Sequence, residues 1–235
     1  MSKDIYGKAL LDYLNNNYTE DLVTFSTITE KDILPLPYLF RSFKEMPRLE
    51  QFALDQCKGH VLDLGAGAGS HSLYLQSKHK QVTAIDISEG AIDVCKKRGV
   101  KNAFVEDIWK LRNRKFDTIL ALMNGAGICG KLENLAAFLL HLKSMMNSKG
   151  QILIDSCDII YMYEDEQGEH WIPSNIPYYG EVEFNISYKK EKATSFSWLY
   201  VDFNTLQRCA NDNGFFCELI HEGEYYDYLV KLTLI

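Results

Sequence analysis

Two periodicities of apolar residues divide this chain of 235 residues into short strands and amphipathic helices. Runs of four to six apolar residues are typical of buried strands, whereas apolar residues at every third or fourth position are typical of one helix face. From residue 61 to residue 156 the two kinds of segment alternate, which predicts parallel strands joined by right-handed helical crossovers. The predicted strands are 61–64, 82–86, 102–105, 116–121 and 150–156, and the predicted helices are 70–77, 89–97 and 132–146.

The regions on either side of this core follow other patterns. Residues 1–56 have apolar positions at helical spacing, interrupted by Pro35 and Pro37, and predict an amphipathic helical extension. The tyrosine-rich and acidic stretch after residue 157 predicts a long loop. Beyond it we predict strands at 181–190 and 195–201, a helix at 203–213, and paired strands at 215–222 and 226–234.

The strand that begins at Val61 runs directly into a glycine loop over residues 65–69 and then into a predicted helix. Glycines at alternate positions allow a tight turn and let a ligand lie against bare backbone. About twenty residues later the next strand ends in Asp86. A carboxylate at the tip of the second strand of a βαβ unit can accept hydrogen bonds from two ribose hydroxyls, so the pattern predicts a nucleotide-type site.

The spacing of the loop favours a nucleoside over a dinucleotide. The third glycine, Gly69, comes one place earlier than the dinucleotide pattern requires, and Ser70 holds the expected position. Asp63, two residues before the first glycine, would repel a diphosphate.

At these residues the chain resembles the class I S-adenosylmethionine-dependent methyltransferases. Residues 61–69 match the first motif of the family, Asp86 its ribose-binding acid, Asp107 its adenine-flanking acid and residues 116–124 its fourth motif. The resemblance extends over about residues 40 to 160 and implies S-adenosylmethionine as cofactor and S-adenosylhomocysteine as product.

The resemblance also implies a fold. It is an α/β fold with a Rossmann-like, seven-stranded, mostly parallel sheet in three α/β/α layers, closed by a C-terminal antiparallel hairpin. Residues 1–56 would form an N-terminal helical extension that acts as a lid. Residues 57–235 would form the methyltransferase domain, with a β-hairpin inserted at about 178–201.

The family assigns a role to each motif residue. Asp86 would bind the ribose hydroxyls, with Ile87 on one adenine face. Asp107 would accept from the adenine amino group, with Ile108 on the other face. The remaining positions would line the amino-acid end of the cofactor: Asp63, Gly65, Ala66, Gly67, Gly69, Met123 and Asn124.

The acceptor and the catalytic residue are less well defined. Candidates for the acceptor pocket are Tyr38, Arg41, Tyr161 and Trp171, and candidates for a base, if a hydroxyl or a protonated amine is methylated, are His170, Tyr161 and Tyr178. Residues 124–127 read Asn-Gly-Ala-Gly instead of the Asn/Asp-Pro-Pro-aromatic sequence of enzymes that methylate exocyclic or amide nitrogens. This departure argues against adenine, cytosine and glutamine amide acceptors.

Composition limits the classes of partner and the cellular locations that we expect for this protein. The net charge of −7 argues against a nucleic-acid partner, which leaves a small-molecule acceptor or a basic protein segment. No apolar run of eighteen residues and no N-terminal apolar signal occur, so we expect neither membrane insertion nor export. The six cysteines form no CxxC pair, which predicts no metal site and a reduced, cytoplasmic location. We expect most of the cysteines to pack in the core. Only for Cys129, which follows a strand in a glycine-rich loop, does a position near the substrate stay an alternative.

Three functional hypotheses follow. The first is an enzyme that methylates a small molecule by in-line displacement. The second is a nicotinamide-dependent oxidoreductase, which the glycine spacing disfavours. The third is a cofactor-binding protein that regulates, or acts on, a protein partner. The sequence leaves the acceptor atom and the oligomeric state open.

Overall fold

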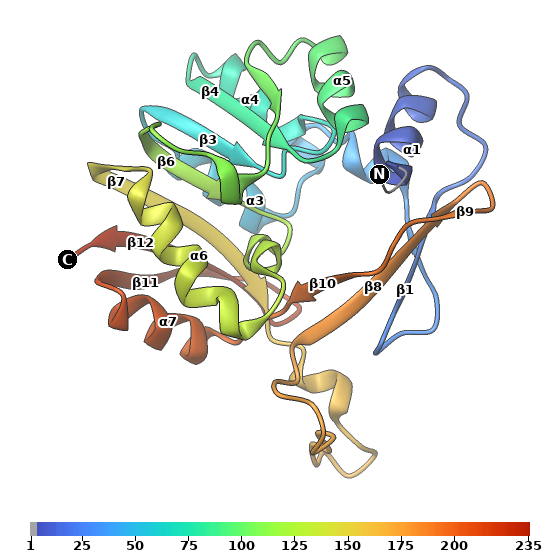
Figure 1. Ribbon diagram of the computed structural model, residues 1–235, viewed down its shortest axis with the longest axis vertical. Helices are drawn as coiled ribbons and strands as arrows, with labels where there is room; N and C mark the ends of the chain where they lie inside the picture. The colour runs from blue at the N-terminus through green and yellow to red at the C-terminus, as the bar shows by residue number, and fades with distance from the viewer. Residues whose placement is uncertain (1–3) are drawn as a thin grey trace.

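A seven-stranded sheet forms the centre of the molecule in the computed structural model, which describes residues 4–235 (Figure 1). The strand order is β11-β12-β7-β6-β3-β4-β5. Strands β3 to β7 are parallel to one another, and β12 runs antiparallel to both β7 and β11. The bounds are β3 His60–Leu64, β4 Gln81–Asp86, β5 Ala103–Val105, β6 Phe116–Ala121, β7 Met146–Cys157, β11 Phe215–Glu222 and β12 Asp227–Leu234.

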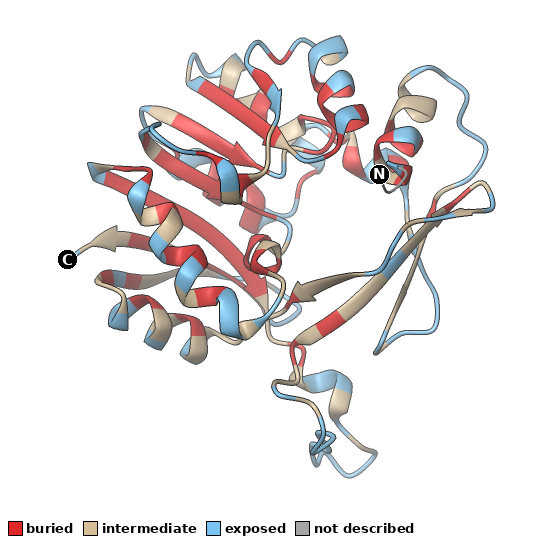
Figure 2. Cartoon of the chain, viewed as in Figure 1, coloured by how far each residue is buried: buried red, intermediate tan, exposed pale blue. Residues whose placement is uncertain are grey.

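Helices cover both faces of this sheet and bury it. One face packs against α3 (Arg48–Gln56), α4 (Ser70–Ser77) and α5 (Glu89–Arg98). The other face packs against α6 (Leu132–Ser144) and α7 (Phe203–Asp212). Figure 2 shows the central strands buried between the helices, as continuous apolar runs in a parallel sheet require. The predicted three-layer α/β fold with an antiparallel C-terminal hairpin is confirmed.

A second sheet was not predicted in full. Its order is β10-β8-β1-β2, with β9 paired to β8. The inserted segment contributes β8 (Glu181–Tyr188), β9 (Glu191–Lys192) and β10 (Phe196–Leu199), and the N-terminal region contributes β1 (Leu22–Ser26) and β2 (Asp32–Leu34). The prediction that residues 1–56 are helical is therefore wrong for residues 22–34. Strand β1 pairs with β8 from Val23↔Ser187 onward, and such distant pairing overrides local periodicity.

The rest of the N-terminal region is helical. Helix α1 (Ile5–Leu14) and the short α2 (Leu36–Leu39) precede α3. Since β1 and β8 join the two regions in one sheet, a division of the chain at residue 57 stays a prediction. Short 3-10 helices lie at Phe43–Glu45, Ile108–Lys110, Gly125–Cys129 and Ile160–Tyr163.

Helix α1 is held against the start of α5. A Cβ atom on Gly90 would lie 2.6 Å from the backbone of Gly7, so the two helices approach as closely as backbone allows. Asp4 caps α1 through the amide of Gly7 and also accepts hydrogen bonds from Ser88 and from the amide of Gly90. This contact places α1 beside the tip of β4.

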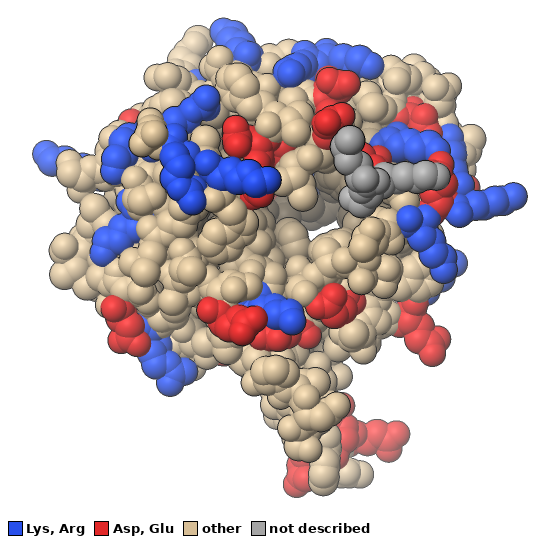
Figure 3. Space-filling model, viewed as in Figure 1, with Lys and Arg blue, Asp and Glu red and all other residues tan. Residues whose placement is uncertain are grey.

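Two features of the outline bear on function. Figure 3 shows the surface hollowed between the body of the molecule and the arm that contains β8 and β1. The segment that follows β7 projects away from both sheets before the chain enters β8 (Figure 1). Within residues 4–235 no helix is long and apolar enough to cross a membrane.

Candidate active site

The glycine loop lies at the carboxyl end of β3, between β4 and β6. The amides of Gly65 and Ala66 both donate to the carbonyl of Ile85, at 2.9 and 3.0 Å, which turns the loop away from the sheet. Gly65 and Gly67 have φ of +72° and +52°, values that side chains disfavour. A Cβ on Gly65 would meet only the Ile128 side chain, at 3.8 Å. The loop therefore presents bare backbone at the predicted position.

Asp86 lies directly opposite this loop. Its Oδ2 accepts the amide of Gly67 at 2.9 Å, and its Oδ1 accepts the amide of Ser88 at 2.9 Å. Each oxygen keeps one lone pair for a ligand hydroxyl. Burial raises the pKa of Asp86 above its ordinary value, although the two amides lower it. The next residue, Ile87, is 76% exposed, so its apolar side chain is available for contact with a ligand.

The N-terminal helix reaches the same place. The hydroxyl of Tyr6 stands over Gly67, 2.9 Å from where a Cβ on that glycine would lie. Burial, followed by the charge of Asp86, raises the pKa of Tyr6. Sequence reasoning missed Tyr6, because nothing in the helical pattern of residues 5–14 distinguishes a residue that faces a ligand from one that faces α5.

Three other predicted cofactor residues have structural roles in the fold. Asp63 is buried and accepts the hydroxyl of Ser72 at 2.5 Å, which ties β3 to α4. Asp107 accepts the amide of Trp109 and pairs with Lys110. Ile108 is buried in the main core.

Packing against α5 requires glycine at position 69. A Cβ on Gly69 would lie 2.9 Å from Cγ2 of Val100 and 3.0 Å from Sγ of Cys95. The missing side chain of Gly69 therefore makes room for α5, and that of Gly67 makes room for the Tyr6 hydroxyl, whereas the space beside Gly65 is open.

The loop after β6 is fixed by polar contacts with neighbouring strands. Asn124 has φ of +58°, donates to the carbonyl of Leu199 and accepts the hydroxyl of Ser156. The amide of Met123 donates to Oδ2 of Asp155 at 3.1 Å, and that of Gly125 donates to Oδ1 at 2.7 Å. Asp155 thus organises the loop that carries Met123 and Asn124.

A cavity of about 290 Å³ opens beside this loop. Its walls come from the N-terminal region, the loop after β6 and the ends of β7 and β12. The lining residues are Tyr38, Pro47, Leu49, Glu50, Met123, Asp155 and Asp227. The volume is close to the lower limit for small-molecule sites in proteins.

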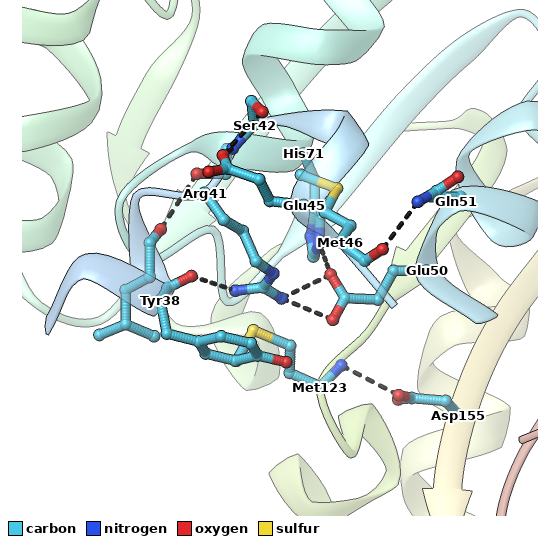
Figure 4. Close-up of polar contacts among 12 residues, drawn as sticks. Tyr38, Arg41, Ser42, Glu45, Met46, Glu50, Gln51, His71, Met123 and Asp155 are labelled. Atoms are coloured by element: carbon cyan, nitrogen blue, oxygen red, sulfur yellow. Dashed lines mark hydrogen bonds and ion pairs between the residues drawn. The ribbon is translucent and has the colours of Figure 1, made fainter. Parts of the chain in front are cut away.

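A buried charge network closes one side of the cavity (Figure 4). Arg41 pairs with both carboxylate oxygens of Glu50, and Nε2 of His71 lies 2.8 Å from the same group. Arg41 also donates to the carbonyl of Tyr38, and its guanidinium lies 3.9 Å from the centre of the Tyr38 ring. Burial alone would raise the pKa of Glu50, but His71 and Arg41 together lower it.

Two residues predicted for the acceptor pocket, Tyr38 and Arg41, belong to this network. Tyr38 lines the cavity, as expected for a pocket residue. Arg41 is buried behind Tyr38 and holds both Tyr38 and Glu50 in position. His71, the second residue of α4, joins the helix that follows the glycine loop to this network.

The other sequence candidates lie outside the cavity. Tyr161 stacks on Tyr226, His170 pairs with Glu164, and Trp171, which is 70% exposed, donates to Asp165 in the projecting segment. Tyr178 bonds both the side chain and the amide of Asp202 at the start of α7. Cys129 is buried, and burial raises the pKa of its thiol to about 12, which makes it a packing residue.

Three cavity acids were missed: Glu50, Asp155 and Asp227. A signal for Asp155 was available, because it ends the apolar run 152–154 just as Asp86 ends the run 82–85. No comparable signal marks Glu50, which stands in a helix, or Asp227, which stands at the start of β12. Within residues 4–235 no group of three potential ligand side chains is placed to hold a metal ion.

The groups at the carboxyl ends of β3 and β4 are chemically suited to bind S-adenosylmethionine. The site combines bare backbone at Gly65, two free lone-pair positions on Asp86 and an exposed Ile87, which is the chemistry that a ligand with an amino-acid part, a ribose and an adenine requires. Together with the seven-stranded sheet, this arrangement defines a Rossmann-like methyltransferase.

Comparison with known proteins agrees. A family model described as a methyltransferase domain matches residues 56–201. The crystal structure of a SAM-dependent methyltransferase from Bacteroides fragilis in complex with S-adenosyl-L-homocysteine is 45% identical, with a TM-score of 0.92 over 99% of this chain and 95% of that one. The chain belongs to the SAM-dependent methyltransferase family, and the predicted cofactor is confirmed.

More distant structures share the fold alone. The CcbJ methyltransferase from Streptomyces caelestis is 12% identical, with a TM-score of 0.63 over 80% of this chain and 90% of that one. The sugar N-methyltransferase KedS8 from Streptoalloteichus sp. ATCC 53650 is 11% identical, with a TM-score of 0.55 over 79% of this chain and 85% of that one. No curated protein matches the chain.

Proposed function

We propose that this methyltransferase acts on a small-molecule acceptor bound in the cavity beside Met123. The observation that carries the proposal is the position of that cavity. It lies at the carboxyl edge of the same sheet as the glycine loop, and β6 is the direct neighbour of β3. A concave space of about 290 Å³ matches the size of a small metabolite, since small-molecule sites in proteins have volumes of about 300 Å³ and more.

We assign the cofactor contacts as follows. Asp86 accepts from the ribose hydroxyls, Ile87 covers the adenine, and the backbone of Gly65, Ala66 and Gly67 lies against the amino-acid part. This assignment rests on the two open lone-pair positions of Asp86 and on the open space beside Gly65. When bound, S-adenosylmethionine supplies a methyl group on a positively charged sulfur. The protein's part is to hold the acceptor in line with it and to exclude water.

Helix α1 acts as a lid over this cofactor. Tyr6 stands above Gly67, and the helix is anchored through Asp4, Gly7 and Gly90. A Tyr6→Ala variant is expected to release S-adenosylhomocysteine at least about tenfold faster, with a smaller change in the association rate. Stopped-flow measurement of both rates tests this. Equal dissociation rates in the variant and the wild type would remove α1 from the cofactor site.

A binding and turnover experiment tests the function itself. Calorimetry with S-adenosylhomocysteine and with NADH separates a methyltransferase from an oxidoreductase, and we expect only the former ligand to bind. S-adenosylhomocysteine release is then followed with a metabolite panel and, separately, with protein fractions. Turnover with protein alone would favour the second candidate, a protein partner, and would contradict a small-molecule acceptor.

We also propose a cytoplasmic location. All six cysteines are free, two of them only partly buried, and free thiols of this kind persist in a reducing compartment.

A further inference from the structure

The ionisable side chains that line the acceptor cavity are acidic, with no basic side chain among them. Its seven lining residues include three carboxyl groups and a phenol, and none is a lysine, an arginine or a histidine. Glu50 is compensated by Arg41 and His71. In the described part of the chain, neither Asp155 nor Asp227 forms an ion pair with a basic side chain. Two carboxylates of the cavity thus lack counter-charges.

Asp155 is the more constrained of the two. It is only 7% exposed, yet it lines the cavity, and the amides of Met123 and Gly125 fix both of its oxygens. A buried carboxylate without a counter-ion is costly unless a ligand provides one. Asp227 lies on the neighbouring strand β12, two residues before Leu229, the register partner of Asp155, and accepts the amide of Tyr225.

The titration of Asp155 fits a proton-accepting role. Burial, which dominates, and the nearby charge of Glu50 raise its pKa to about 6, despite the hydrogen bonds from the loop amides. At that pKa the carboxylate is charged at pH 7 and is about a hundredfold more basic than an ordinary aspartate. Besides Glu50, the groups that face it are Tyr38 from α2 and Asp227 from β12, with Arg41 and His71 behind Glu50.

We propose that the acceptor is a small amine, bound as its ammonium ion between Asp155 and Asp227 and deprotonated by Asp155. This inference rests on the proposed function. An ammonium ion supplies the missing counter-charge and has N–H donors for both carboxylates, and the Tyr38 ring offers an additional surface for a cation.

The chemical step balances without another reactant. A proton passes from the ammonium nitrogen to a carboxylate oxygen of Asp155, and the nitrogen keeps its electron pair. That nitrogen forms a bond to the methyl carbon as the methyl–sulfur bond breaks, and the sulfur retains the bonding pair. The product leaves as a methylated ammonium ion, and Asp155 returns its proton to water.

The same charges exclude other acceptors. A neutral alcohol of equal size would leave two carboxylates without a counter-ion, and an anionic acceptor would be repelled. We therefore expect kcat/KM for an amine to exceed that for its matched alcohol by at least about a hundredfold.

Matched pairs of acceptors test the proposal on the full-length protein. Benzylamine with benzyl alcohol and glucosamine with glucose are supplied with S-adenosylmethionine, and S-adenosylhomocysteine release is measured from pH 5 to pH 9. With an amine, kcat/KM should decrease below about pH 6, where Asp155 becomes protonated. Transfer to the alcohols at equal rates, or to no amine at all, would overturn the proposal.

A binding measurement provides a readout independent of turnover. Calorimetry of the best amine is carried out on the protein saturated with S-adenosylhomocysteine. Asp155→Asn and Asp227→Asn should each weaken amine binding at least about tenfold, while the affinity for S-adenosylhomocysteine changes less than about threefold. Asp93→Asn, on the exposed face of α5, is the matched control and should change neither.

The two levels of failure are distinguishable. Wild-type amine affinity in both variants, with S-adenosylhomocysteine still bound, would reject the amine assignment alone. Failure of the wild type to bind S-adenosylhomocysteine would reject the proposed function itself.

Discussion

Replacement of Asp86 by Asn tests the assignment of the ribose site most directly. The substitution keeps the size of the side chain but removes its charge and one of its acceptor oxygens. In the protein, both oxygens already accept backbone amides, from Gly67 and from Ser88, and each has one position left for a ligand. Asparagine can serve one of these amides and at most one ribose hydroxyl.

The expected loss of affinity follows from this count. A hydrogen bond to a charged group contributes roughly 1.5–3 kcal/mol. Loss of one such bond should therefore weaken S-adenosylhomocysteine binding by about 10- to 150-fold. The effect should appear mainly in the dissociation rate, since the ribose is held only after the cofactor has entered.

The stability of the cofactor-free protein should change much less. Loss of one amide acceptor costs about 1 kcal/mol. Removal of the buried charge acts in the opposite direction, because burial raises the pKa of Asp86 in the folded protein. With a raised folded pKa, the contribution of Asp86 is present below its unfolded pKa and is lost as the pH rises through the folded one. At neutral pH the two effects partly cancel, and we expect Tm to shift by only a few degrees.

The assay combines titration calorimetry with thermal unfolding. Asp93→Asn removes the same charge from an exposed position on α5 and should leave both affinity and Tm unchanged. An Asp86→Asn protein that is folded and binds S-adenosylhomocysteine with the wild-type dissociation constant would show that the ribose lies elsewhere.

Three further predictions concern the energetics of the site. Glu50→Gln leaves Arg41 buried without its counter-charge and should cost about 3 kcal/mol, or a Tm decrease of about 6–12 °C in thermal unfolding. The double variant Arg41→Met/Glu50→Leu should recover most of this, and no recovery would contradict a charge-based explanation. Gly69→Ala should lower the free energy of unfolding by about 1–3 kcal/mol in urea titrations, because its Cβ meets Val100 and Cys95; the folded fraction should keep the wild-type affinity for S-adenosylhomocysteine, and a large loss would place Gly69 against the ligand. Since the pKa of Asp155 is raised to about 6, its contribution to stability should decline by about 3 kcal/mol as the pH rises from about 4 to above 6; urea titrations of wild type and Asp155→Asn at several pH values should differ in slope over this range, and parallel curves would refute it.

Local sequence patterns were sufficient for the central fold. The five parallel strands are continuous apolar runs and the helices between them have a regular period, so short-range information locates both. The nucleotide-type site could be predicted for the same reason. The glycine loop and Asp86 stand at the ends of adjacent strands, and parallel strands bring such ends to one edge.

The second sheet could not be predicted in this way. Strand β1 is five residues long and β2, which pairs with it, only three. The other partner of β1, β8, is more than 140 residues further along the chain. Strands of this length are stabilised by backbone hydrogen bonds with the partner and not by a pattern of their own.

The sequence by itself determined the class of fold, the glycine loop and the acid that faces it, because these depend on residues close together in the chain. Only the tertiary structure decided which side chains line the cavity that we propose for the acceptor. Glu50, Asp155 and Asp227 come from a helix and two non-consecutive strands, and packing alone brings their carboxyl groups around one cavity. Burial then gives Asp155 a basicity that no local sequence can specify, since desolvation depends on every segment that covers the group.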